Sequence, residues 1–192
     1  SSSVNQVRVM GSADADTLVL DPAVAPRDGI VFEGAGDSSD ALDTLILQTG
    51  VESAPQANIH HVLGAQGGSV AMLASGGSDG AFVEYVGIER IEDRLTTGAR
   101  RFALEDGVSA RLTGGADTGH SSLVTSSGTT VDFTDPTTAL RVTALGNPSA
   151  AAADGAPRLA VDGTFSIAGG DIFVDAGAGG FLEVSATLST SA

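Results

Sequence analysis

Short β-forming segments recur throughout the chain, and this rhythm constrains the fold more than any other feature of the sequence. The segments are rich in Val, Ile, Leu, Phe and Thr, and clusters of Gly, Asp, Ser and Pro separate them. A spacing of about eight to twelve residues between such segments is typical of an all-β chain. The predicted strands are Val4–Val9, Thr17–Leu20, Ile30–Phe32, Thr44–Leu47, Ile59–Leu63, Ser69–Leu73, Phe82–Val86, Phe102–Leu104, Ala110–Thr113, Ser122–Val124, Thr130–Phe133, Leu140–Thr143, Arg158–Val161, Thr164–Ile167, Asp171–Val174 and Phe181–Val184.

Two all-β architectures share this rhythm, a parallel β-helix (a solenoid) and a β-sandwich. A sandwich core usually buries large aromatic residues, whereas only 4% of this chain is aromatic. A solenoid stacks short aliphatic strands, with Gly and Asp at its tight turns. Residues 16–20, Asp-Thr-Leu-Val-Leu, recur as Asp-Thr-Leu-Ile-Leu at 43–47, and this offset of 27 residues suits one turn of a β-helix. We therefore predict an irregular right-handed parallel β-helix, with a β-sandwich as the alternative.

Two segments depart from the strand pattern. Residues 87–95 carry apolar side chains at helical spacing, although the same segment is consistent with a strand whose charged residues face outward. Residues 147–157 are rich in Ala and Pro and predict a loop. This loop divides the chain into solenoid turns at 1–146 and a C-terminal strand group at 158–192, which we expect to be continuous with the same core.

The charge of the chain excludes several partners. It has 24 acidic and nine basic side chains, a net charge of −15, and all nine basic residues are arginine. Such a surface repels nucleic-acid phosphates and anionic lipid headgroups. No apolar run approaches the ~18 residues of a membrane-spanning helix. The chain has no cysteine, which excludes disulfides and thiolate chemistry.

Acidic residues beside glycine are the candidate metal ligands. The chain has 17 Asp but only 7 Glu, and Asp is a common turn former because its carboxylate bonds nearby backbone N–H groups. Calcium takes about six to eight oxygen ligands, which turns rich in Asp and Gly can supply. The candidate ligands of a structural calcium ion are Glu33, Asp37, Asp40 and Asp43, together with Asp14 and Asp16. The alternative is that these residues form ordinary solvated turns.

Part of the sequence resembles a known family. Residues 34–37, Gly-Ala-Gly-Asp, followed by the strand at 43–47, resemble the Gly- and Asp-rich repeats of bacterial RTX-type surface and secreted proteins. Residues 83–91 are similar to a strand of very large repetitive bacterial adhesins. The resemblance implies a calcium-stabilised β-roll or β-helix that acts in surface attachment or as an extracellular scaffold. Ser38 stands where the regular repeat has an acid, which favours an irregular solenoid.

Residues with catalytic potential do not form a recognisable motif. His60 and His61 are neighbours in a predicted strand, so their side chains should point to opposite faces. Residues 117–122 contain Asp, His and Ser, but a catalytic triad requires these groups to converge in space, which closeness in sequence does not ensure. An enzymatic β-helix would need a pair of carboxylates or an arginine at its substrate, and the densest arginine group is Arg90, Arg94, Arg100 and Arg101.

The sequence therefore predicts a non-enzymatic β-solenoid module, secreted or on the cell surface, with a structural or adhesive role. A solenoid has open ends, so we expect self-association into a filament or membership in a larger repetitive surface protein. The expected partners are further copies or neighbouring repeats, with carbohydrate as an additional ligand. The alternative function is that of a polysaccharide-active β-helix enzyme, a lyase or a glycosidase.

Overall fold

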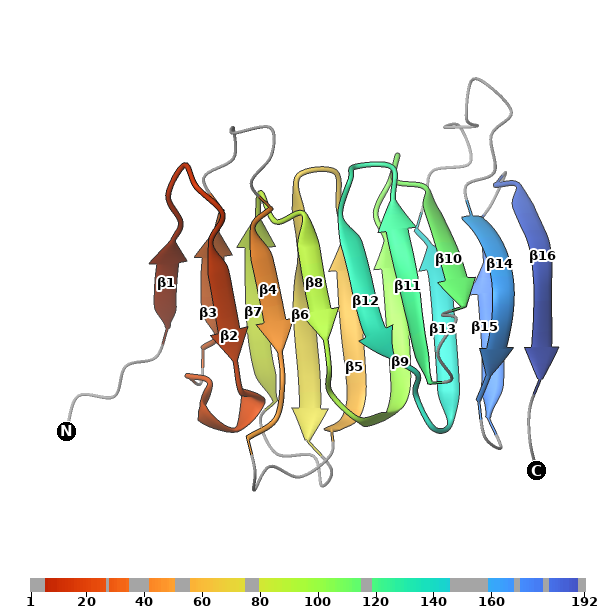
Figure 1. Ribbon diagram of the computed structural model, residues 1–192, viewed down its shortest axis with the longest axis horizontal. Coiled ribbons are helices and arrows are strands. Elements are labelled where there is room, and N and C mark those ends of the chain that lie inside the picture. The colour runs from red at the N-terminus through yellow and green to blue at the C-terminus, as the bar shows by residue number, and fades with distance from the viewer. Residues whose placement is uncertain are drawn as a thin grey trace.

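Two β-sheets of eight strands each face one another and enclose one apolar core in this computed structural model (Figure 1). Sheet A consists, in spatial order, of β1 (Val7–Met10), β3 (Ile30–Glu33), β7 (Ala81–Val86), β6 (Gly67–Ala74), β5 (Gln56–Leu63), β9 (Thr97–Leu104), β13 (Ala139–Ala144) and β15 (Asp171–Asp175). Sheet B consists, in the same direction, of β2 (Thr17–Leu20), β4 (Thr44–Leu47), β8 (Arg90–Asp93), β12 (Thr130–Thr134), β11 (His120–Thr125), β10 (Ala110–Gly114), β14 (Leu159–Ser166) and β16 (Leu182–Ser189).

The structure describes residues 6–26, 28–34, 42–50, 56–74, 80–114, 119–145, 159–167, 170–177 and 180–189. Within them, the one helical element is a short 3₁₀ turn, η1 (Pro22–Val24), and no helix is long and apolar enough to cross a membrane. The predicted all-β class is thus confirmed, in the form of two mixed sheets. The predicted loop at 147–157 lies outside the described residues.

Parallel pairing dominates both sheets because the chain crosses to the other sheet between most successive strands. In sheet A only β6 runs against its neighbours, and in sheet B only β11 does. Each reversed strand is the middle of a three-stranded meander, β5-β6-β7 in sheet A and β10-β11-β12 in sheet B. In each meander the first strand lies farthest from the preceding strands of its sheet, and the next two strands fill the space between them. In sheet A, for example, β6 and β7 lie between β5 and β3.

The repeat in the sequence corresponds to two adjacent strands. Strands β2 and β4 are parallel neighbours, paired from Thr17 with Thr44 to Leu20 with Leu47. The leucines of the repeat point inward, since side chains alternate between the two faces of a strand, and Leu45 and Leu47 are fully buried. The 27-residue offset is therefore the length of chain between laterally paired strands.

The helical alternative for residues 87–95 is wrong, because this segment contains β8. Along β8 the side chains alternate, with Ile91 and Asp93 buried between the sheets and Arg90 and Glu92 on the outer face. The two C-terminal segments expected at 158–161 and 164–167 are joined in the single strand β14. Gly163 lies within this strand at φ +90°, where its backbone passes close to that of β10.

Candidate functional site

The predicted calcium ligands only partly come together. Asp16 and Asp43 directly precede β2 and β4, and the N–H of Asp16 donates to Oδ1 of Asp43 over 2.8 Å. The N–H of Asp43 donates in turn to Oε2 of Glu89, the residue before β8, also over 2.8 Å. These three acidic residues form a ladder along one edge of the molecule, which satisfies backbone N–H groups at successive turns.

The remaining candidate ligands lie apart from this ladder. Glu33 forms an ion pair with Arg8, with oxygen–nitrogen distances of 2.6 and 2.8 Å, and Asp14 is exposed. Asp37 and Asp40 lie outside the described residues. In the part of the chain that the structure describes, no three His, Asp or Glu side chains converge as metal ligands. Calcium binding therefore stays a prediction.

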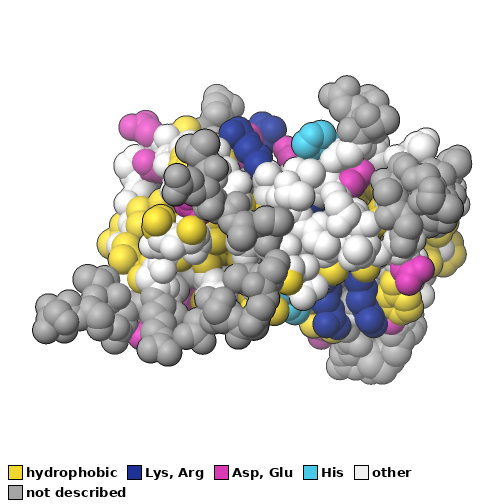
Figure 2. Space-filling model, turned by 90° about the horizontal axis from the view of Figure 1, so that it is seen from below, with side chains coloured by type: hydrophobic (Ala, Val, Ile, Leu, Met, Phe, Trp, Pro, Cys, Tyr) yellow, Lys and Arg dark blue, Asp and Glu magenta, His cyan; other side chains and the backbone are white. Residues whose placement is uncertain are grey.

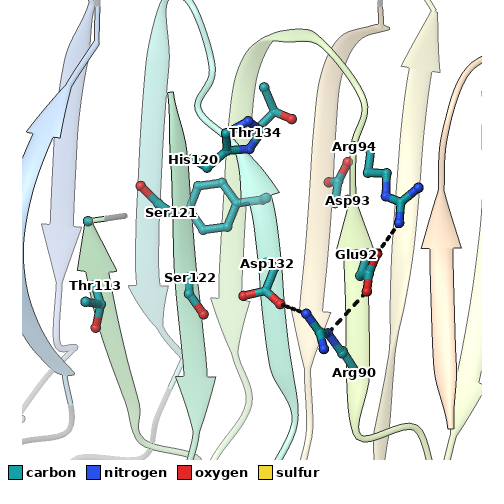
Figure 3. Close-up of a pocket in the computed structure, with 12 residues that line it drawn as sticks. Arg90, Glu92, Asp93, Arg94, Thr113, His120, Ser121, Ser122, Asp132 and Thr134 are labelled. Atoms are coloured by element: carbon teal, nitrogen blue, oxygen red, sulfur yellow. Dashed lines mark hydrogen bonds and ion pairs between the residues drawn. The ribbon is translucent and has the colours of Figure 1, made fainter. Parts of the chain in front are cut away.

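A cavity of about 890 Å³ lies on sheet B at the ends of β8, β11 and β12 (Figure 3). Arg90 bridges two carboxylates across it, with Nε 3.3 Å from Oε1 of Glu92 and Nη2 3.0 Å from Oδ2 of Asp132. Arg94 holds the second oxygen of Glu92 at 2.5 Å. Both carboxylates on the outer face are thus neutralised by arginine.

Among the described residues, no hydrogen bond joins His120 to Ser121 or Ser122, although all three line this cavity. His120 faces outward and is exposed, whereas Ser121 faces the core and its buried Oγ has no hydrogen-bond partner in the described structure. The two residues are neighbours on β11, so their side chains point to opposite faces of the sheet. Asp117 lies outside the described residues.

Three buried polar side chains join the two sheets, and we call them the buried trio: His61 of β5, Asp93 of β8 and Arg100 of β9. The Nε2 atom of His61 lies 2.8 Å from Oδ2 of Asp93. Arg100 holds the same carboxylate with two nitrogens, Nε at 3.1 Å from Oδ2 and Nη2 at 2.9 Å from Oδ1. Arg100 also donates to the backbone carbonyls of Leu95 and Thr134.

The buried trio is arranged to be neutral overall. Burial lowers the pKa of His61, although Asp93 opposes this effect. Burial also works against ionisation of Asp93, but Arg100 and the hydrogen bond from His61 outweigh it and hold the pKa of Asp93 below its ordinary value. The trio therefore consists of one cation, one anion and an uncharged imidazole, which is stacked on Phe102 at 4.9 Å between ring centres.

The sequence reasoning missed the buried trio because it expected the charged residues of 87–95 to face outward and considered Arg100 only as an arginine for a substrate. It did predict that His60 and His61 face opposite sides, and this is confirmed, since His61 is buried and His60 lies on the outer face. The same alternation could have placed Arg100 on the inner face of β9, since it lies two residues from Phe102.

Core-facing side chains are uncovered at both ends of the two sheets. The N-terminal end is formed by β1 and β2, and the C-terminal end by β15 and β16. Val7 of β1 is 37% exposed, although its partner Ile30 on β3 is buried. On β16, Val184 is 53% exposed, whereas its partner Val161 on β14 is buried. Each end therefore exposes two edge strands, one from each sheet, together with apolar side chains that face the core.

The geometry thus defines an all-β protein of two facing mixed sheets, with a neutralised cavity, a buried polar trio and two uncovered ends. Comparisons with protein-family models, with curated proteins and with solved structures found no match.

Proposed function

We propose that this protein is a structural module that associates end to end with further copies of itself. The observation that carries the proposal is the exposure of core-facing apolar side chains on the edge strands at both ends. An edge strand offers unpaired backbone N–H and C=O groups to another strand, and exposed apolar side chains beside it favour that contact.

The strand directions support a head-to-tail contact. All strands of sheet A except β6 are parallel, so β1 and β15 run the same way, and β2 and β16 likewise agree in sheet B. Strand β15 of one copy can therefore continue in parallel pairing with β1 of the next copy, while β16 meets β2. A contact between two different surfaces that does not close on itself produces a filament.

The path of the chain supports a solenoid as the finer description of the fold. Pairs of strands such as β1 and β2, then β3 and β4, add one strand to each sheet in turn. The crossover between parallel strands of one sheet is right-handed in nearly all proteins, which is the hand we propose here. The two meanders make this solenoid irregular.

The proposal places the module outside the cell, with calcium at its turns. Its support is the resemblance of residues 34–37 to RTX-type repeats and the acidic ladder along one edge. A non-enzymatic role agrees with the cavity on sheet B, where Glu92, Asp93 and Asp132 are all bound by arginine.

Sedimentation velocity over a range of protein concentrations tests the association. We expect the wild type to sediment as growing oligomers, and Val184→Lys to sediment as smaller species because it puts a charge at the open C-terminal end. The matched control is Val124→Lys, which changes the same residue type at 41% exposure on the outer face of β11, far from both ends. A wild type that stays monomeric at high concentration, or a Val184→Lys variant that associates like the control, refutes the proposal.

A backbone variant tests strand pairing without adding a charge. Val7 and Gly11 donate their N–H groups to Gly29 and Glu33 in the direction of β3, so the N–H of Met10 points toward the open edge. Met10→Pro removes this edge donor while leaving the pairing with β3 in place. We expect the variant to fold with an unchanged circular dichroism spectrum but to associate less than the wild type.

A further inference from the structure

The outer face of sheet A carries a row of side chains that the stacking of copies does not use. Successive registers place these residues next to one another on six adjacent strands: Phe82, Ala71, His60, Arg101, Arg141 and Phe173. Adjacent strands lie about 4.8 Å apart, so the two arginines are side by side, with His60 next to Arg101 and Phe173 next to Arg141. Figure 2 shows dark-blue arginine side chains beside yellow hydrophobic ones in the lower right part of that view.

Among the described residues, Arg101 and Arg141 differ from the other arginines in having no acidic partner. Five described arginines form ion pairs with Asp or Glu, namely Arg8, Arg90, Arg94, Arg100 and Arg111. Within the described ranges, no ion pair involves Arg101 or Arg141. On a chain of net charge −15, two adjacent guanidinium groups that no described carboxylate binds can offer charge-assisted hydrogen bonds to a ligand.

The neighbouring side chains orient Arg141, and His60 lies beside Arg101. The guanidinium of Arg141 lies over the ring of Phe173, 4.3 Å from its centre, and its Nε is 3.3 Å from Oγ1 of Thr143. His60 Nε2 is buried and has no hydrogen-bond partner among the described residues. Burial, Arg101 and His61 together lower the pKa of His60, so its imidazole is uncharged at neutral pH and can offer one N–H.

A cavity of about 340 Å³ lies over this group. Its polar lining includes Asn58, His60, Arg101 and Arg141, and its apolar lining includes Leu73, which is 49% exposed. This volume is near the lower limit for small-molecule sites, so it suits one small ring with a charged substituent. Arg101 and Arg141 make one side of the cavity cationic, and Leu73 makes another side apolar. Such a cavity suits a ligand that has one anionic group and one apolar face.

We propose that this cavity binds a single acidic sugar residue, with its carboxylate held by Arg101 and Arg141. The planar guanidinium groups match a carboxylate in two-point hydrogen bonding. Asn58 is placed to bond sugar hydroxyls, and Leu73 offers apolar surface to the ring. The net charge of −15 repels polyanions, which favours isolated acidic sugars in a mainly neutral glycan over a densely charged chain.

Titration of the ¹⁵N-labelled protein with glucuronate, followed by NMR chemical shifts, tests this site. We expect glucuronate to shift the signals of β5, β9 and β13, and glucose and inorganic sulfate to bind at least about tenfold more weakly, because each supplies only part of the ligand chemistry. Equal binding of glucose and glucuronate refutes the role of the arginines. Equal binding of sulfate and glucuronate refutes the role of the sugar ring.

Two variants distinguish this site from charge effects elsewhere. Arg101→Gln and Arg141→Gln alter exposed side chains, so the fold should persist, and each should weaken glucuronate binding about tenfold or more. The matched control is Arg111→Gln on the outer face of sheet B, which removes the same charge far from the cavity and should bind like the wild type. If all three variants bind glucuronate equally, the proposed site is wrong. That result would leave the proposed association of copies standing, because sedimentation tests it separately.

Discussion

Replacing Asp93 by Asn removes the charge at the centre of the buried trio while keeping the size of the side chain. The carboxylate accepts hydrogen bonds from His61, from two nitrogens of Arg100 and from the N–H of Leu95. In the variant, an amide NH₂ group faces donor groups, and the buried guanidinium of Arg100 loses the carboxylate that binds it. Breaking a buried ion pair in this way costs about 3–5 kcal/mol.

Urea unfolding measures this cost. With an m-value of about 2 kcal/mol/M, a loss of about 3–5 kcal/mol lowers the unfolding midpoint by roughly 1.5–2.5 M. The matched control is Asp132→Asn, which breaks the pair with Arg90, where the two side chains are 39% and 46% exposed. An exposed pair contributes at most about 1 kcal/mol, so the control should lower the midpoint by no more than roughly 0.5 M.

A double-variant cycle checks that the effect belongs to the pair itself. Asp93→Leu and Arg100→Met each leave an unpaired buried charge, but the two together leave none. We therefore expect the free energy lost in the double variant to be smaller than the sum of the two single losses by more than about 1 kcal/mol. Additive losses, or an Asp93→Asn variant as stable as Asp132→Asn, would refute the view that the buried trio joins the sheets.

Three further predictions follow from the buried histidine, a close backbone approach and the acidic turns. Burial lowers the pKa of His61 in the folded protein. Below the ordinary histidine pKa of about 6.5, the unfolded chain binds a proton that the folded chain excludes, so the free energy of unfolding decreases as the pH is lowered. Between pH 7 and 5 the free energy of unfolding should change less with pH in His61→Gln than in the wild type, and an equal change in both proteins would contradict this. Gly114→Ala puts a Cβ against the carbonyl oxygen of Thr164 and should lower the free energy of unfolding in urea by about 1–3 kcal/mol. Gly98→Ala should cost less, because the nearest atom to its new Cβ is 3.2 Å away. Calcium should raise the melting temperature and a chelator should lower it, and a melting curve indifferent to both removes the calcium prediction.

The sequence predicts the strands well where a core side chain alternates with a polar one. Strand β12 begins at the predicted residue and ends one residue beyond the predicted end, because buried Val131 and Phe133 alternate with Thr130 and Asp132. Such alternation depends only on neighbouring residues and is visible in any single sequence. The order of strands within a sheet depends on pairing between distant segments, so the position of β5 beside β9 has no local signal.

The segment at 87–95, for which the sequence allows either a helix or a strand, shows how turns can imitate a helical pattern. Ile88, Ile91 and Leu95 are all buried, as the helical spacing requires. Only Ile91 belongs to β8, however, and the other two lie in the turns at its ends, where the chain crosses between the sheets. A similar ambiguity hid Asp93, since a charged residue at a core position is identified only through its partner, and Arg100 comes from the other sheet.

The two meanders have a consequence for the order in which the molecule forms. Their hairpins pair segments close in sequence, so they can form early and at low entropic cost, whereas β1, β2, β15 and β16 gain partners only after β3, β4, β13 and β14 are in place. The meanders thus give the chain a central nucleus from which strands are added outward on both sides. Insertions or deletions that add or remove a pair of strands at either end leave this nucleus unchanged. The length of such a protein can therefore vary while the chain folds from the same nucleus. Hydrogen exchange should accordingly show the slowest amides in β5, β6, β11 and β12 and progressively faster ones toward each end.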